Sequence, residues 1–132
     1  MTTVQPKPMP RTRLELGYDK NLMLFSGRAN PDLGARIADK LGIEPGPVTL
    51  RTFTNGEVYC RYGESVRGAD VFIVQPMCAN PAAGLTPNDA IMELLLMIDA
   101  AVGASAHRVI AVTPWFGYSR QDKKSAPRTD SP

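Results

Sequence analysis

An α/β fold is first indicated by residues 21–42, which read NLMLFSGRANPDLGARIADKLG. The apolar run Leu22–Phe25 stops at a Ser-Gly pair, and a short run bounded by turn residues is typical of a strand buried on both faces. Asn30 then supplies a helix N-cap, followed by a proline and a carboxylate in the first turn. Apolar residues recur at helical spacing up to Gly42, which ends the predicted helix. The stretch therefore predicts a strand that leads into a helix.

A β-hairpin is predicted after this helix. Val48–Phe53 reads as a strand, and the alternation over Val58–Tyr62 predicts a return strand. Between the two, Asn55-Gly56 favours a type I′ turn, which requires positive φ at both residues.

The remaining elements alternate between strand and helix. Val71–Val74 and Val109–Val112 are short apolar runs typical of buried strands. Between them, after a loop, a helix capped near Asn88 is expected to end at Gly103. Its apolar stripe consists of Ile91, Leu94, Leu95, Ile98 and Val102, broadened by Met92, Leu96 and Met97. So apolar a helix is expected to be covered on most sides, by the sheet or by a partner subunit. The alternation of strands and helices predicts a largely parallel sheet with flanking helices and one inserted hairpin.

Composition and charge indicate a soluble globular chain. The 132 residues suffice for one core, and 43% hydrophobic with 21% charged residues is ordinary for such a domain. A net charge of +2 is too small to indicate nucleic acid or a membrane as partner. No apolar run has the length of a signal peptide or a membrane helix, so we expect a cytoplasmic protein. Cys60 and Cys78 lack zinc-site spacing and are expected to be free thiols.

The two ends of the chain set the expected domain bounds. Residues 1–20 are rich in Pro, Thr and Arg without periodicity, so a flexible leader is expected there, with order beginning at Asn21. The chain ends twenty residues after Val112. Only two helices are convincing, although a parallel sheet needs helices on both faces. Residues 21–132 are therefore expected to form an incomplete domain.

Six stretches, in this order, resemble segments of the phosphoribosyl diphosphate synthetases, also called ribose-phosphate pyrophosphokinases. They are LFSG (24–27), FTNGE (53–57), GESVRG (63–68), VQ (74–75), ND with MEL (88–89 and 92–94) and FGYSRQDKK (116–124). Each stretch is weak alone, but all of them in the family's order form a specific match, which runs from Asn21 to Arg128. The incomplete domain is thus expected to be the N-terminal domain of such an enzyme.

The resemblance implies a phosphoribosyltransferase-like α/β domain and a phosphotransferase of nucleotide biosynthesis. Enzymes of this family transfer the diphosphoryl group of Mg-ATP to the C1 hydroxyl of ribose 5-phosphate, giving phosphoribosyl diphosphate and AMP. The resemblance also implies a homo-oligomer, a hexamer built from dimers, with ATP bound at a subunit boundary. Neither nucleic acid nor a membrane is expected as a partner.

Two segments match the family's ATP site. In the hairpin, Phe53 would stack on adenine, and Asn55, Gly56 and Glu57 would form the loop that reads the edge of the base. The alternative is a plain hairpin with Phe53 in the core and Glu57 in solvent. The second segment is Arg120, Gln121, Asp122 and Lys123, whose donors and positive charge suit a triphosphate. Its alternative is a solvated charged loop.

A third set of residues matches a regulatory phosphate or ADP site found in many members of the family. These residues are Ser65, Arg67 and Ser105, and the alternative is a turn serine beside a surface arginine. His107 is expected to be structural or exposed. Trp115 and Tyr118 are expected to pack rather than to stack on a ligand.

The chain departs from the family after Arg128. The family's magnesium-binding histidine, its catalytic Lys/Arg loop and its ribose-phosphate loop find no match, so no catalytic residue and no Mg²⁺ ligand is assigned in this chain. A truncated or frameshifted product, inactive alone, is therefore expected. One alternative is a non-catalytic regulatory or interaction subunit that joins a full-length synthetase. Another is a flavodoxin-like nucleotide-binding module, which the lack of a Gly-rich phosphate loop disfavours.

Overall fold

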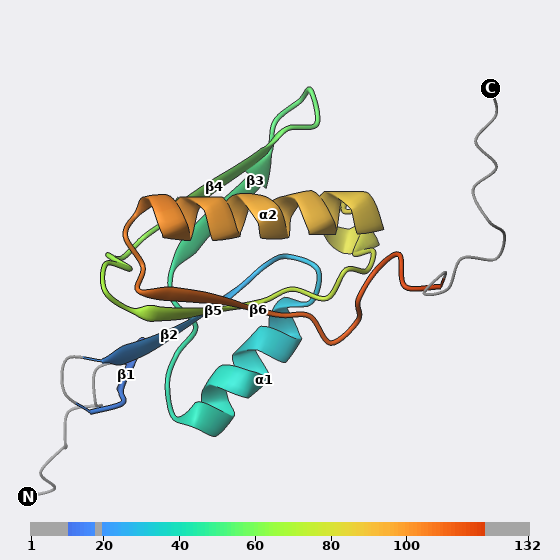
Figure 1. The fold of residues 1–132 in the computed structure, drawn as a ribbon. Helices are drawn as coiled ribbons and strands as arrows, with labels where there is room; N and C mark the ends of the chain where they lie inside the picture. Colours follow the sequence, from blue (N-terminus) through green and yellow to red (C-terminus); the bar gives the residue numbers. More distant parts are fainter. Residues whose placement is uncertain (1–10, 18–19, 121–132) are drawn as a thin grey trace, which may run out of the picture.

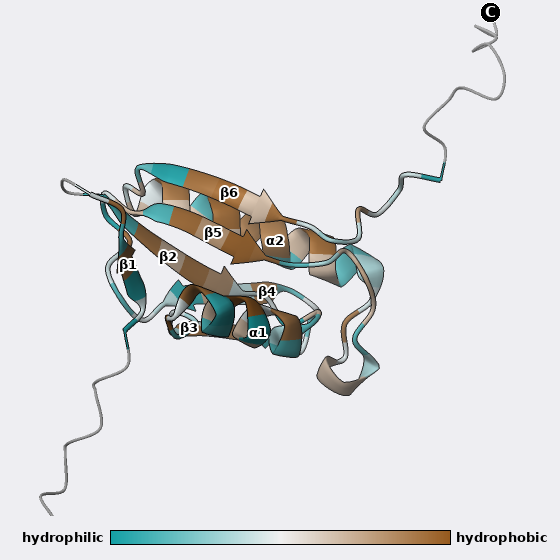
Figure 2. Cartoon of the chain, turned by 90° about the horizontal axis from the view of Figure 1, so that it is seen from below, coloured by the Kyte–Doolittle hydropathy of each residue, from teal (hydrophilic) through white to brown (hydrophobic). Residues whose placement is uncertain are grey.

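The computed structural model describes residues 11–17 and 20–120, with a four-stranded sheet at its centre (Figure 1). The strand order is β1-β2-β5-β6, and the strands are Arg13–Glu15, Asn21–Ser26, Asp70–Val74 and Arg108–Val112. β2, β5 and β6 are parallel, whereas β1 runs antiparallel to β2. Figure 2 shows how apolar the parallel strands are. β2 and β5 each bury three residues, as expected for strands covered on both faces. β6 buries none, so the prediction of a buried strand at Val109–Val112 is wrong in its burial. The predicted, largely parallel sheet is confirmed.

Layers of different kinds cover the two faces of the sheet. On one face α1 (Pro31–Leu41) packs against β2. On the other face α2 (Pro87–Gly103) lies beside a hairpin made of β3 (Val48–Thr52) and β4 (Val58–Tyr62), and β4 contacts the helix (Figure 1). A short 3-10 turn, η1 (Pro81–Ala83), lies in the loop before α2. In the described part of the chain, no helix is long and apolar enough to cross a membrane.

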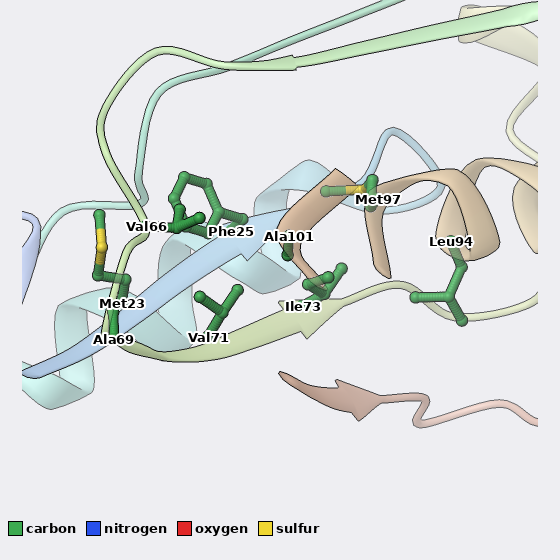
Figure 3. Packing of buried hydrophobic residues seen from close by; sticks show 9 residues of the cluster. All are labelled: Met23, Phe25, Val66, Ala69, Val71, Ile73, Leu94, Met97 and Ala101. Atoms are coloured by element: carbon green, nitrogen blue, oxygen red, sulfur yellow. The ribbon is translucent and has the colours of Figure 1, made fainter. Parts of the chain in front are cut away.

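The larger core lies between the sheet and α2. It consists of Met23, Phe25, Val66, Ala69, Val71, Ile73, Leu94, Met97 and Ala101 (Figure 3). The hairpin closes this core from the side, because the ring of Tyr62 packs edge-on against Phe25 with centroids 4.6 Å apart. The Tyr62 hydroxyl also donates to the carbonyl oxygen of Met97 at 2.6 Å. One end of the hairpin is thus fixed to both the sheet and α2.

The predicted ends of α1 are confirmed. The Asn30 side chain accepts a hydrogen bond from the Leu33 backbone N–H at 3.1 Å. At the other end Gly42 takes a left-handed φ of 72°, which costs glycine least. The helix packs over a smaller core formed by Leu24, Ala38, Ile43 and Val74.

Ordered structure begins before Asn21, so the expected flexible leader is wrong for Arg13–Glu15. These residues form β1, with Leu14 opposite Leu22 in antiparallel register. Leu14 also packs against the smaller core. The pairing covers an edge of β2 that would otherwise expose unpaired backbone groups. A strand of three residues is too short for alternation to reveal it.

The hairpin turn differs from the predicted type I′. Gly56 has a φ of 95°, but Asn55 is not among the described residues with positive φ. The Phe53 N–H donates to the Glu57 carbonyl oxygen at 2.7 Å, and the Gly56 N–H donates to the Phe53 carbonyl oxygen at 2.9 Å. Three residues thus form the loop, which ends in a left-handed glycine. The Asn55 side chain accepts from the Glu57 N–H at 3.1 Å, a local bond that stabilises this turn without positive φ at Asn55.

α2 is capped by Thr86, two residues before Asn88, near which the cap was predicted. The Thr86 hydroxyl accepts from the Asp89 N–H at 3.1 Å, and the Asp89 carboxylate accepts from the Thr86 N–H at 2.9 Å. Pro87 fills the first helical position, where its missing N–H costs nothing. A reciprocal capping box satisfies two backbone donors, which favours a helix start at Thr86.

The buried side of α2 is also displaced from the predicted stripe. The buried residues are Ala90, Glu93, Leu94, Met97 and Ala101. Leu95 and Val102, which the stripe included, are more than half exposed. Small residues such as Ala90 and Ala101 let the helix approach the sheet closely. A prediction from hydrophobicity alone takes no account of this effect of side-chain size.

Replacing Thr86 with alanine should lower the free energy of unfolding by about 1 kcal/mol at neutral pH. Backbone and side-chain hydrogen bonds with Thr86 hold the pKa of Asp89 below its usual range. A carboxyl group whose pKa falls on folding stabilises the folded protein at pH values above the pKa of that group in the unfolded chain, which is about 4. This stabilisation is lost as the pH falls through the pKa of the group in the folded protein. The difference between Thr86→Ala and the parent should therefore shrink on acidification, as urea unfolding at several pH values would measure. A difference independent of pH would contradict the capping box.

Candidate functional site

The tip of the hairpin exposes the first set of predicted site residues. Phe53 is 45% exposed, which excludes the alternative that places it in the core. Its ring meets Tyr59 edge-on with centroids 5.9 Å apart, and the Arg51 guanidinium lies 5.7 Å from the Phe53 centroid. These neighbours hold the ring in place and leave a large part of it open to a planar ligand.

Polar groups are fixed beside this ring. The Asn55 Nδ2 donates to Glu57 Oε2 at 3.0 Å, so amide and carboxylate orient each other. A carboxylate has further lone pairs and can accept from a second donor, such as an exocyclic amine. The tip residues line a hollow of about 580 Å³ together with Val58, Asp89, Met92 and Leu96. The tip thus joins a flat apolar surface to oriented acceptors.

Arg120 lies at the second predicted segment, beyond the carboxyl end of β6. It lines a hollow of about 640 Å³ between the segment that follows β6, the segment that follows β5 and the start of α2. Open α/β sheets bind ligands at this edge. Gln121, Asp122 and Lys123, predicted to belong to the same segment, lie outside the described residues.

Two aromatic residues in this hollow contradict the expectation that they pack. Trp115 is 59% exposed and Tyr118 is 79% exposed. The Tyr118 hydroxyl donates to the Asn88 side chain, which ties the segment to the first turn of α2. Both side chains line the hollow that contains Arg120. The sequence could not reveal this, because their surroundings are set by loops rather than by a periodic element.

Phe53 and Arg120, the described residues that represent the two predicted groups, do not line the same cavity within one chain. Pro87 and Ile91 of α2 line the hollow of Arg120, whereas Asp89, Met92 and Leu96 line that of Phe53. Positions two residues apart on a helix face different sides. The two hollows therefore open on different sides of α2.

A buried polar network, which no pattern in the sequence predicts, connects these elements. Glu93 and Gln75 are fully buried, and Gln75 Nε2 donates to Glu93 Oε2 at 2.8 Å. Glu93 also accepts from Arg28, through the backbone N–H at 2.8 Å and through Nε at 2.6 Å. Every buried side-chain nitrogen or oxygen in the described residues has a hydrogen-bond partner. The only sequence signal was one carboxylate on the apolar side of a helix.

The predicted regulatory residues come from two loops that meet. Ser65 and Arg67 follow β4, and Ser105 follows α2 with a φ of 67°. The Gly68 N–H donates to the Ser105 carbonyl oxygen at 2.9 Å, which joins the loops. The Ser65 hydroxyl accepts from the Arg67 N–H at 3.4 Å, which is the turn role named as the alternative. The regulatory assignment stays a prediction.

The titratable side chains near the core do not form a reactive or metal-binding centre. Both cysteines are free and half-buried, and burial raises the pKa of the Cys60 thiol to about 11, with the charge of Glu93 adding to the rise. Cys60 is therefore protonated at neutral pH and a poor nucleophile. His107 is exposed and lies 2.9 Å from the Asp70 carboxylate. Among residues 11–17 and 20–120, no three His, Cys, Asp or Glu side chains gather as ligands for a metal ion.

Comparison with known proteins gives a consistent result. Residues 22–131 match the family described as the N-terminal domain of ribose phosphate pyrophosphokinase. A ribose-phosphate pyrophosphokinase of Gloeobacter violaceus is 45% identical over 127 residues, covering 96% of this chain and 34% of the relative. Ribose-phosphate pyrophosphokinase 1, chloroplastic, of Oryza sativa is 51% identical over 126 residues, covering 95% of this chain and 30% of the relative.

A solved structure agrees with the sequence relatives. The phosphoribosylpyrophosphate synthetase of Mycobacterium smegmatis superposes with a TM-score of 0.70 at 42% identity, over 84% of this chain and 35% of that chain. The chain therefore spans about a third of the length of the proteins it matches.

Proposed function

This chain belongs to the ribose-phosphate pyrophosphokinase family, whose N-terminal domain it matches, and we propose that it supplies part of that family's ATP site. The reaction is the transfer of a diphosphoryl group from ATP to ribose 5-phosphate, which gives phosphoribosyl diphosphate and AMP. The proposal rests on one observation above all. An exposed Phe53 ring stands beside an amide and a carboxylate that fix each other at the tip of a hairpin.

The hairpin tip would bind the base of the nucleotide. The exposed face of Phe53 offers area for stacking, and Glu57 offers an acceptor for the exocyclic amine of adenine. Guanine carries a carbonyl at the equivalent position, which a carboxylate acceptor would repel. The proposed site therefore prefers ATP to GTP.

Arg120 would bind the phosphates. Its guanidinium carries a permanent charge and a rigid fork of donors that matches phosphate oxygens. The Mg²⁺ implied by the resemblance would enter with the triphosphate, on which it neutralises charge. None of the described residues is proposed as its ligand. The proposed role of this chain is to bind and orient the nucleotide.

One complete ATP site would then need two copies of the chain. The hollow of Phe53 and the hollow of Arg120 open on different sides of α2, so they do not offer a single nucleotide one common cavity within one chain. A homo-oligomer in which the hairpin of one copy meets Arg120 of another satisfies this requirement, and closed symmetric assemblies generate such contacts repeatedly.

A complementation experiment tests this function. Phe53→Ala and Arg120→Ala should each weaken binding of Mg-ATP to the chain at least about tenfold in isothermal titration calorimetry. An equimolar mixture of the two variants should regain about a quarter of the sites, because one pairing in four joins an intact hairpin to an intact arginine. Arg36→Ala, an exposed arginine of α1, serves as the matched control and should bind as the parent does.

Two results would count against the proposal. If ATP binding survives both substitutions, the nucleotide binds elsewhere than at Phe53 and Arg120. If the mixture binds ATP no better than the single variants do, a second copy of the chain does not contribute to the site.

A further inference from the structure

We propose that Arg28 is a positioning residue that sets the direction of the hairpin tip, an inference that rests on the proposed role of Phe53 in binding adenine. Arg28 lies in the loop between β2 and α1, so it belongs to neither the hairpin nor the segment of Arg120. It joins the buried Glu93 of α2 to Thr52, the residue directly before Phe53.

Arg28 is held at its backbone on both sides. Its N–H donates to Glu93 Oε2 at 2.8 Å, and its carbonyl oxygen accepts from Asn80 Nδ2 at 2.7 Å. The next N–H, of Ala29, donates to the side-chain oxygen of Gln75 at 3.1 Å. Three side chains from three other segments therefore fix the point from which the Arg28 side chain extends.

The direction of the guanidinium is fixed by the buried carboxylate. Arg28 Nε donates to Glu93 Oε1 at 2.6 Å, and Glu93 is fully buried while the Arg28 side chain is 22% exposed. A buried carboxylate cannot give up its cation without a large desolvation cost, so the pair stays formed. Because the guanidinium is planar and rigid, fixing Nε also fixes where its terminal nitrogens point.

One of those nitrogens reaches the hairpin. Arg28 Nη2 donates to Thr52 Oγ1 at 2.9 Å. At the other end of the hairpin, the Tyr62 hydroxyl donates to the Met97 carbonyl oxygen. In the described part of the chain, these are the two side-chain hydrogen bonds that join β3 and β4 to other elements. One anchor lies beside the tip and one at the opposite end, since Thr52 pairs with Val58 and Tyr62 pairs with Val48.

Packing of Leu50 and Cys60 against the larger core holds the body of the hairpin, and the two anchors add fixed points at its two ends. The tip lies beyond that packing, so it would move more freely if the anchor beside it were lost. The tip itself consists of exposed residues, whose local bonds hold its shape but not its direction. The bond from Arg28 to Thr52 therefore transmits the rigidity of the buried network to Phe53. Precise placement of binding groups before the ligand arrives lowers the entropy cost of binding.

Hydrogen exchange of backbone amides tests the anchor directly. Thr52→Val removes the hydroxyl at constant shape and leaves the pair of Arg28 and Glu93 intact, so the fold should be retained. We expect exchange at the Phe53 and Gly56 amides to rise about fivefold, the loosening that loss of one hydrogen bond produces. Thr52→Ser keeps a hydroxyl and should restore the parent rates. Thr54→Val removes a neighbouring hydroxyl that makes no side-chain hydrogen bond in the described residues, and it serves as the matched control.

Binding of Mg-ATP tests the consequence of the anchor. Thr52→Val should weaken affinity about threefold, and Thr52→Ser should restore it. Arg28→Lys, which keeps the charge but not the fork, should behave as Thr52→Val does where it folds. Equal exchange rates in Thr52→Val and Thr54→Val would overturn the anchor.

The two proposals can fail separately. Faster exchange in Thr52→Val with unchanged ATP affinity, while Phe53→Ala still weakens binding, would overturn the positioning role and leave the ATP site standing. If Phe53→Ala also bound ATP as the parent does, the adenine role of the hairpin would be wrong, and the positioning role would fail with it.

Discussion

Replacing Arg28 with methionine is expected to lower the free energy of unfolding by about 3–5 kcal/mol. Methionine keeps much of the apolar stem but removes the cation that faces Glu93, whose side chain is fully buried. The carboxylate would then lie unpaired in the interior, and relocating it to water would disrupt the packing of α2. Urea unfolding followed by circular dichroism measures the change. The expected loss is a large fraction of the total stability of a small domain.

A second substitution separates the buried charge from the lost packing. Arg28→Met combined with Glu93→Gln removes both charges and keeps a side-chain oxygen that can accept from the backbone N–H at position 28. This double variant should recover at least about half of the loss. Arg36→Met is the matched control, because Arg36 pairs with Asp32 at 3.2 Å on the exposed side of α1. It should cost at most about 0.5 kcal/mol. Similar losses of unfolding free energy for Arg28→Met and Arg36→Met would contradict the stabilising role of the cation at Arg28 beside buried Glu93.

Gly27→Ala is expected to destabilise the fold by about 3 kcal/mol or more, although it adds one methyl group. A Cβ at Gly27 would lie 2.1 Å from the side-chain oxygen of Gln75. Gln75 is fully buried and cannot move without breaking its hydrogen bonds to Ala29, Ala90 and Glu93. The added methyl group therefore disrupts the whole buried network rather than a single contact.

The control for this prediction is Gly103, a glycine at which an added methyl group would have free space. A Cβ at Gly103, in the last turn of α2, would meet nothing within 4 Å. Gly103→Ala should raise the free energy of unfolding by up to about 1 kcal/mol, since alanine favours a helix over glycine. Thermal melts of both variants would check the two signs. A neutral Gly27→Ala would mean that Gln75 has room to rearrange.

The sequence predicted the elements whose signals are local. The strands of the parallel sheet follow apolar runs such as Leu22–Phe25, and α1 follows from Asn30 and Gly42, whose capping chemistry acts within a few residues. The hairpin was predicted correctly from alternation and from Asn55-Gly56, but the predicted type I′ turn is wrong. The backbone bond from Phe53 to Glu57 depends on how the two strands meet, which local preference does not determine.

The sequence predictions were wrong where tertiary contacts determine the local structure. The strand Arg13–Glu15 exists because β2 offers an edge, and the buried side of α2 is chosen by small residues that let it approach the sheet. In the candidate site, the exposure of Phe53 excludes its placement in the core, and its role in binding adenine stays a prediction. The link from Glu93 through Arg28 to Thr52 joins residues far apart in the sequence, and no periodic pattern records such a link.

The separation of the two hollows on either side of α2 has a consequence for the proposed site under dilution. Where each site is shared between two copies, the number of sites follows the law of mass action and falls faster than the chain concentration once the copies dissociate. Nucleotide and self-association then reinforce each other, because ATP that binds across the boundary stabilises the assembled form. ATP binding at the proposed site would thus depend on the concentration of the chain itself. A cell could abolish this binding by lowering the number of copies, without any change in the sequence.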